Sequence, residues 1–337
     1  MRKLLVSTII GTVAAVTGAG PVLACGGIFS ANGEVNLVRT TTLAAYHEGI
    51  EHYVTAFEFA GSGGAFGSIV PLPGVPTAVE KGGEWTLQRL VREVEPPVEA
   101  RTVALAADAS TAGPAEVLLE TRIDALDLTV LRGGGAAVGE WAAANGFTLT
   151  PDAPEVLDFY ARRSPIFLAA RFDADAARRG GVALGDGTPV HLTIPTENPW
   201  VPLRILALGR KAQERVNADV FLLTDRRPAL LPGEDADGLS LQSQERASAS
   251  LLGDLRSDRG MEWMPEAMWL SHLRVDASPA ELTYDLAVDA SGQGRPSPLA
   301  AGLADGGDVT GGGTGADGPP LAAVLPFAAL AGAGVLA

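Results

Sequence analysis

Two stretches in the N-terminal half of the chain have the side-chain alternation of an extended strand. In residues 50–60, Tyr53 and Thr55 occupy every second position and so fall on one face of an extended chain. This two-residue period is typical of a strand. Residues 34–46 lie just before them and predict the other arm of a hairpin. Residues 117–131 alternate again and predict either one long strand or a second hairpin. The N-terminal half is therefore predicted to be rich in β-structure.

Helical spacing of apolar residues is confined to short segments. Residues 85–94 predict a helix that ends before Pro96 and Pro97. Residues 136–145 and 152–163 predict two more short helices, the first with Trp141 as its buried anchor. The order of elements predicts an α+β fold with mixed or antiparallel sheets and a few short helices. The remaining predicted elements are strands at 66–71, 165–172, 189–194, 202–208, 219–224 and 282–288, a helix at 261–273 and a polar acidic loop at 233–247.

The N-terminus has the three parts of an export signal. Arg2 and Lys3 precede an apolar run of 13 residues, 4–16, and small residues follow up to Ala24. The run is shorter than the ~20 residues that a membrane span needs. Residues 1–24 are therefore predicted to be a signal peptide and the protein to be exported.

The single cysteine, Cys25, directly follows the predicted cleavage site. Lipoproteins of bacteria carry their diacylglyceryl group on a cysteine in this position, which makes Cys25 a candidate for lipidation. Leu23 departs from that pattern, because a small residue is usual two positions before the cysteine. The alternatives are ordinary cleavage that leaves a free thiol and an N-terminal nucleophile whose α-amine acts as base.

The C-terminal part changes composition twice. Residues 291–318 are rich in Gly, Ala and Asp and lack aromatic side chains, which predicts a disordered linker. Residues 319–337 are apolar throughout and predict a C-terminal membrane anchor, with a frayed apolar tail as the alternative. The body between the signal and the linker divides into a β-rich part, 25–132, and an α+β part, 133–290.

Charge excludes one class of partner. The chain has 25 Lys and Arg against 40 Asp and Glu, for a formal net charge of −15. Binding to nucleic acid requires clustered basic side chains that contact phosphates, so no nucleic-acid partner is predicted. With 47% hydrophobic residues, the body is expected to form a core.

The segment between the first two predicted strands contains the only arrangement that suggests a metal. If Glu48 and Gly49 form a two-residue hairpin loop, His47 and His52 lie diagonally on one face of the hairpin. They would then be close enough to share a metal ion, with Glu48 or Glu51 as a carboxylate for hydrolytic chemistry. A three-residue loop would place the two imidazoles on opposite faces, and a solvated polar tip is the simpler interpretation.

Other chemistry is sparse. The sequence contains neither a phosphate-binding loop ending in Lys nor the Gly-x-Ser-x-Gly turn of serine hydrolases, and no cofactor is predicted. Trp200 lies between Pro199 and Pro202 in a segment that must be extended, which makes its ring a candidate for a surface-binding side chain.

Several short motifs, in a fixed order, link the body to a known family. They lie between about 25 and 288 and are Cys25-Gly26-Gly27, Val70-Pro71-Leu72-Pro73 with Pro76, Leu128-Thr129-Val130-Leu131, Trp141 to Phe147, Pro165 to Ala169, Ile194-Pro195-Thr196 and Pro202 to Ile205. In these motifs the chain resembles the bacterial domain-of-unknown-function family numbered 2330. The resemblance implies an exported protein, often with a single C-terminal span, and supplies no catalytic residue.

Two functional hypotheses follow. The first is a membrane-anchored binding or structural ectodomain of the bacterial cell envelope that is not an enzyme. Its partners would be the membrane, through the C-terminal segment, and an unknown envelope component. The second is a metal-dependent envelope hydrolase that uses His47 and His52 with Glu48 or Glu51.

Overall fold

The computed structural model describes most of the body. The described residues are 27–30, 36–60, 66–94, 116–173, 176, 187–233 and 236–304. The predicted signal peptide, Cys25 and the predicted anchor at 319–337 lie outside them. Among the described residues, no helix combines the length and the apolar character that crossing a membrane requires.

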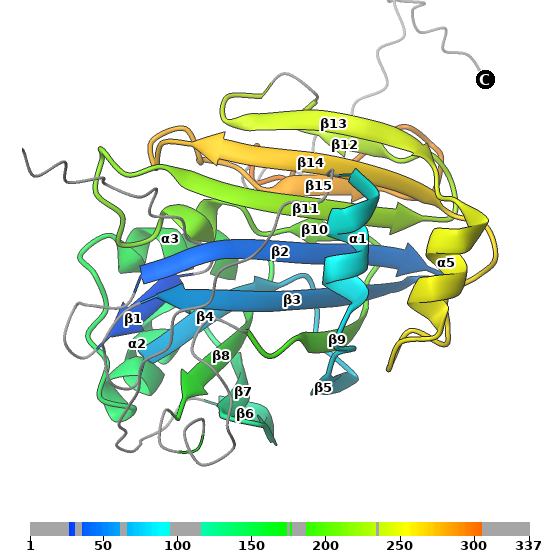
Figure 1. Ribbon diagram of the computed structural model, residues 1–337. Helices are drawn as coiled ribbons and strands as arrows, with labels where there is room; N and C mark the ends of the chain where they lie inside the picture. The colour runs from blue at the N-terminus through cyan, green and yellow to red at the C-terminus, as the bar shows by residue number, and fades with distance from the viewer. Residues whose placement is uncertain are drawn as a thin grey trace, which may run out of the picture. The chain divides into compact units, whose positions relative to one another are not determined.

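The largest element is a seven-stranded sheet (Figure 1). Its neighbouring strands are antiparallel except β11 and β2, which run parallel. The strands in order are β13 (Leu239–Arg246), β14 (Trp269–Ala277), β11 (Val216–Thr224), β2 (Asn36–His47), β3 (Ile50–Ala60), β9 (Val190–Pro195) and β5 (Ala78–Lys81). The hairpin predicted at 34–60 is β2 and β3.

Two smaller sheets accompany it. The five-stranded sheet contains, in order, β1 (Gly27–Ser30), β4 (Phe66–Leu72), β8 (Ile166–Phe172), β7 (Leu126–Arg132) and β6 (Glu116–Ile123). The three-stranded sheet contains β10 (Trp200–Val201), β15 (Leu286–Asp289) and β12 (Ala229–Leu231). All pairs in both sheets are antiparallel. Residues 117–131 are therefore a hairpin rather than one strand.

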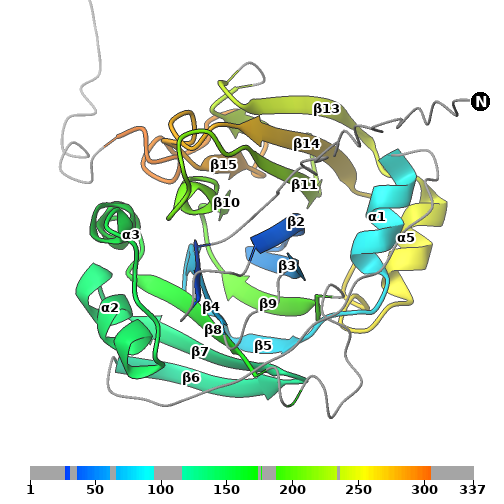
Figure 2. The same cartoon turned by 60° about the vertical axis from the view of Figure 1, so that its left-hand side comes forward.

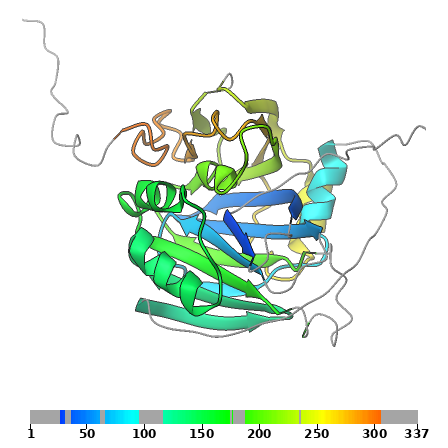
Figure 3. The ribbon, with the colours of Figure 1, turned by 90° about the vertical axis from the view of Figure 1, so that its left-hand side faces the viewer.

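The helices lie on two sides of the sheets. Figure 2 shows α1 (Thr86–Val94) and α5 (Ala249–Arg256) together beside the seven-stranded sheet. The helices α2 (Gly135–Ala144) and α3 (Ala153–Ala161), green in Figure 3, lie next to the five-stranded sheet. Trp141 on α2 is buried, with 6% of its surface exposed, as predicted.

Alternation in β2 and β3 divides the buried side chains between two hydrophobic cores. Leu43, Ala45 and Val54 belong to an outer core with α1, α5 and Met261 to Met268. Ala44 and Tyr53, one position out of phase, belong to the larger inner core between the sheets. Both faces of the central hairpin are thus covered, although only the inner one faces the other sheets.

The predicted fold class is confirmed: the sheets are mixed and antiparallel, the helices are few and short, and the N-terminal half is mostly β. Three predicted elements are wrong. Residues 202–208 form a 3₁₀ turn, η1 (Arg204–Ala207), rather than a strand. Residues 261–273 contain Pro265 and end in β14 rather than forming a helix, and the predicted loop at 233–247 contains β13. In each case pairing or capping by distant residues decides the local conformation.

The predicted disordered linker begins too early. Residues 291–304 are folded onto the body, where the backbone of Ala301 is buried and its carbonyl accepts a hydrogen bond from the Asp285 amide. Gly302 packs so closely against α3 that an added Cβ would lie 2.2 Å from the Phe159 ring. The segment is held by backbone contacts and small side chains, which its composition does not reveal.

A buried carboxylate holds this region together. Asp285 is fully buried and accepts hydrogen bonds from the Tyr160 hydroxyl at 2.8 Å and from the backbone N–H groups of Leu203 at 2.7 Å and Arg204 at 3.0 Å. Its second oxygen accepts a hydrogen bond from the guanidinium of Arg163. Asp285 therefore caps the first turn of η1 and ties it to α3.

Replacing Asp285 by Ala should lower the free energy of unfolding by about 3–5 kcal/mol, because the substitution leaves the Arg163 charge buried without its partner. Chemical denaturation of the two proteins measures the difference. Asp276→Ala is the matched control, since Asp276 pairs with Arg215 at an exposed site and should change stability by less than ~1 kcal/mol. A similarly small loss for Asp285→Ala would contradict this role.

Candidate functional site

The loop that joins β2 to β3 has two residues, as the metal hypothesis requires. Glu48 and Gly49 have φ angles of 49° and 82°, and His47 pairs directly with Ile50. Two consecutive residues with positive φ are typical of a tight hairpin turn. His47 and His52 therefore lie on the same face of the hairpin, which is the outer face of the sheet.

The two imidazoles nevertheless bind different partners. His47 Nδ1 lies 2.8 Å from the Asp225 carboxylate, whereas His52 Nδ1 lies 3.0 Å from Nε2 of His191 on β9. Both rings stack against Trp263, with ring centroids separated by 6.2 Å for His47 and 3.7 Å for His52. The arrangement is a packed row of rings on the outer face.

Burial keeps His52 and His191 uncharged. Burial, together with the nearby His191 and His47, lowers the pKa of His52 to about 3. Burial also lowers the pKa of His191, against the opposing effect of Glu80 and Glu262. Two neutral imidazoles satisfy each other, because one ring nitrogen donates and the other accepts.

The carboxylates of the hydrolase hypothesis do not join the histidines. Glu51 follows β-strand alternation and points to the inner face, opposite to His52, while Glu48 lies in the exposed turn. In the part of the chain that the structure describes, no three His, Cys, Asp or Glu side chains are placed to hold a metal ion. The constellation that metal-assisted hydrolysis needs is not assembled there.

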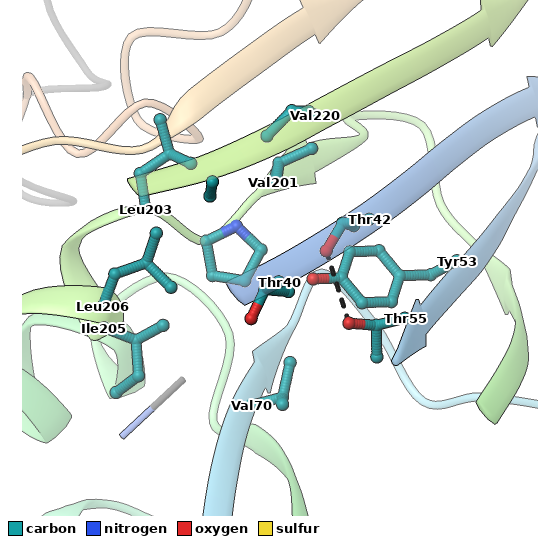
Figure 4. A pocket seen from close by; sticks show the side chains of 12 residues that line it. Thr40, Thr42, Tyr53, Thr55, Val70, Val201, Leu203, Ile205, Leu206 and Val220 are labelled. Atoms are coloured by element: carbon teal, nitrogen blue, oxygen red, sulfur yellow. Dashed lines mark hydrogen bonds between the residues drawn. The ribbon is translucent and has the colours of Figure 1, made fainter. Parts of the chain in front are cut away.

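A cavity lies on the inner face of the same hairpin, and we call it the threonine cavity. It encloses about 360 Å³ of empty space, part of it open to solvent, between β2, β3, β11, β4 and the segment that carries η1 (Figure 4). Its lining residues are Thr40, Thr42, Tyr53, Thr55, Val70, Val201, Pro202, Leu203, Ile205, Leu206, Ala218 and Val220. Much of this volume is open solvent, and the enclosed part is far smaller than the ~300–1,000 Å³ typical of small-molecule sites, so a ligand larger than a few water molecules would have to widen it.

The polar atoms of the threonine cavity are hydroxyl groups. The Thr42 and Thr55 hydroxyl oxygens lie 3.3 Å apart, across the β2–β3 pair (Figure 4). The hydroxyl of Thr40 is buried without a hydrogen-bond partner. Because a buried hydroxyl without a partner is unfavourable, this group is available to a water or a ligand.

A second, smaller space continues along the same strands, and we call it the Glu51 chamber. It encloses about 210 Å³, again including some open solvent. Its lining residues are Ala44, Tyr46, Glu51, Pro199, Trp200, Val201, Leu222, Thr224 and Val288. Val201 borders both spaces, and each of β2, β3 and β11 contributes residues to both.

Trp200 is not a surface-binding side chain. Only 3% of its surface is exposed, and its ring lies 5.8 Å from that of Tyr160 in a stacked arrangement. The segment around it is extended, as predicted, but β10 pairs with β15 and so directs the ring inward. The prediction of an exposed ring is therefore wrong, and Trp200 is a wall of the Glu51 chamber.

Comparison with protein families identifies the group to which the chain is related. Residues 20–238 match the model of DUF2330, described as an uncharacterized protein conserved in bacteria. The chain belongs to this family. The match confirms the resemblance inferred from the short motifs, and it includes every lining residue of both spaces except Val288.

Comparison with other proteins adds no function to this DUF2330 member. A search of curated proteins gives no significant match. Among solved structures, the chain is similar to baculovirus P35, at 9% identity and a TM-score of 0.42, covering 79% of this chain and 99% of that one. It also matches a mutated baculovirus P35 after caspase cleavage, at 9% identity and a TM-score of 0.36, covering 75% and 99%. TM-scores this low do not establish a shared fold.

Sequence reasoning missed the inner-face site, although one signal was present. Glu51 is in phase with Tyr53 and Thr55, and the strand period therefore places all three on one face. The threonines that face them from β2 give no comparable signal. Thr40, Thr41 and Thr42 are consecutive, so the residue type does not alternate between the two faces of the strand.

Acid should destabilise the protein partly through His52. Its pKa is lower in the folded protein than the ordinary 6.5, so its contribution to stability is present above pH 6.5 and is lost as the pH falls. Between pH 7 and pH 4.5, the wild-type chain should lose about 2 kcal/mol more of its unfolding free energy than His52→Phe, which retains a ring against Trp263. Urea denaturation at the two pH values measures this, and equal losses would contradict it.

Proposed function

We propose that this DUF2330 protein is an exported, membrane-anchored binding protein of the bacterial cell envelope and not an enzyme. The predicted signal at 1–24 and the apolar segment at 319–337 support the location. The threonine cavity supports the binding role, because it combines apolar walls with a few hydroxyl groups on a rigid sheet.

The threonine cavity is the observation that carries this proposal. Eight of its twelve lining residues are Val, Leu, Ile, Pro or Ala, which favours an aliphatic ligand. The three threonine hydroxyls provide hydrogen bonds that orient a polar group on the ligand. The walls come from all three sheets and from η1, which Asp285 fixes, so binding of an aliphatic ligand would require some of these side chains to move apart.

Hexan-1-ol is a suitable probe of this cavity, and isothermal titration calorimetry with the full chain measures its binding. At ~0.6 kcal/mol for each non-hydrogen atom, its Kd should be about 1 mM. Ala218→Leu extends a side chain into the cavity and should weaken binding at least tenfold.

The matched control is Val117→Leu, an enlargement of an apolar side chain that is 44% exposed and lies outside the cavity. It should leave the Kd of hexan-1-ol within twofold of the wild-type value. Absence of binding to the wild-type chain, or equal binding by the Ala218→Leu variant, would contradict the proposed function.

Membrane attachment is tested by fractionation of cells that express the full chain. The wild-type protein should sediment with membranes, and the combination of Cys25→Ser with truncation after Gly318 should release it into the soluble fraction. Truncation alone distinguishes the two anchors, because a lipid on Cys25 would retain the shortened chain. Retention of the double variant would contradict both anchors.

A further inference from the structure

Glu51 is a buried carboxyl group without a side-chain partner. It is fully buried, and neither of its side-chain oxygens makes a well-formed hydrogen bond. The backbone N–H of Trp200 lies close enough to favour the ionised form. An acidic group in this state is costly, so the position is explained best if a group from outside the chain pairs with it.

The walls around Glu51 suit a positively charged group. Tyr46, which pairs directly with Glu51 across the two strands, and Trp200 contribute aromatic side chains to the chamber. None of its nine lining residues is basic. A carboxylate among aromatic rings is the combination that recognises organic ammonium groups, through charge pairing and cation–π attraction.

The Glu51 chamber lies next to the threonine cavity along β3, and this position indicates what kind of group a ligand bound at Glu51 would carry. Glu51 and Tyr53 are two residues apart on the same face of β3, which corresponds to about 7 Å along the strand. Tyr53 already lines the threonine cavity, and Val201 borders both spaces. An alkyl chain that starts at Glu51 and follows the strand is therefore directed towards the threonine cavity, and the two small spaces would have to widen to hold it.

We propose that Glu51 binds the ammonium group of a small primary amine whose alkyl chain lies in the threonine cavity. The inference rests on the proposed function, since it assigns a ligand class to the same cavity. Tyr46 lines the chamber and is partly exposed, and its hydroxyl donates a hydrogen bond to the Thr196 carbonyl at 2.9 Å. Movement of this side chain would admit the ligand.

Binding of the amine is coupled to proton release. Burial raises the pKa of Glu51 to about 8, so at neutral pH the empty chamber holds mainly the protonated acid. The bound ammonium keeps its proton and pairs with the carboxylate, and the proton of Glu51 passes to solvent. An alkylammonium ion, like Lys, loses its own proton only near pH ~10.4.

Other titratable groups at the chamber do not reverse this direction. Tyr46 is the one other titratable side chain that lines it, and burial raises its pKa above the ordinary 10. Arg163 lies 5.0 Å from the centre of the Trp200 ring and is paired with Asp285. Amine affinity should therefore rise about tenfold per pH unit below pH 8 and level off above it.

The test compares hexylammonium chloride with hexan-1-ol by isothermal titration calorimetry on the full chain. At pH 8, hexylammonium should bind at least tenfold more tightly than the alcohol, and at pH 7 its binding should release close to one proton, measured in two buffers of different ionisation enthalpy. Glu51→Gln, which has nearly the same shape, should remove the preference and leave the Kd of the alcohol within twofold.

The outcomes separate the two proposals. If neither compound binds, the proposed function fails and this inference fails with it. If the alcohol binds and the amine binds no more tightly, or if Glu51→Gln retains the preference, Glu51 holds only a water or its own proton, and the inference alone is overturned. The pH dependence of hexylammonium affinity in the wild-type chain tests the inference without a variant. An affinity that does not change between pH 6 and pH 8 would contradict the inference.

Discussion

The inner side of this protein depends on one buried carboxylate, Asp285. It binds Tyr160 of α3 and Arg163, which follows the end of that helix, and it caps the backbone of Leu203 and Arg204 at the start of η1. The Tyr160 hydroxyl in turn accepts a hydrogen bond from the Ile205 amide at 2.8 Å. Because every donor around Asp285 has a partner, the segment that covers the threonine cavity is fixed in position rather than merely packed there.

A second constraint is the two-residue period of β3, which separates two kinds of chemistry. His52 points to the outer face and is paired with His191 beneath Trp263, so its polar atoms are used within the chain. Glu51, the preceding residue, points to the inner face and has no side-chain partner. A metal-dependent hydrolase would need both residues on one face, whereas a binding site needs only the unpaired one.

The buried polar groups of this protein are of two kinds: those with a partner in the chain stabilise its fold, and those without one suggest a ligand. Asp285 and His52 have partners, and such groups stabilise one arrangement of the chain. Thr40 lines the threonine cavity and Glu51 lines the neighbouring chamber, and neither side chain has a hydrogen-bond partner. The position of these two groups beside the two spaces is the reason for assigning the ligand to them.

Local patterns in the chain were sufficient to predict the elements that near neighbours specify. The β2–β3 hairpin, the β-structure of residues 117–131, the burial of Trp141 and the family were readable from alternation, turn residues and short motifs, although the choice between one strand and a hairpin at 117–131 was not. These features depend on neighbours within a few residues, where side-chain period and turn chemistry act directly.

Features that depend on distant partners became visible only in the folded chain. Residues 202–208 form a 3₁₀ turn because Asp285, some 80 positions later, caps it, and Trp200 turns inward because β15 pairs with β10. Residues 291–304 are ordered because they pack on α3. The role of Glu51 likewise required the cavity around it, because a strand's period shows which face a residue occupies but not what lies opposite that face.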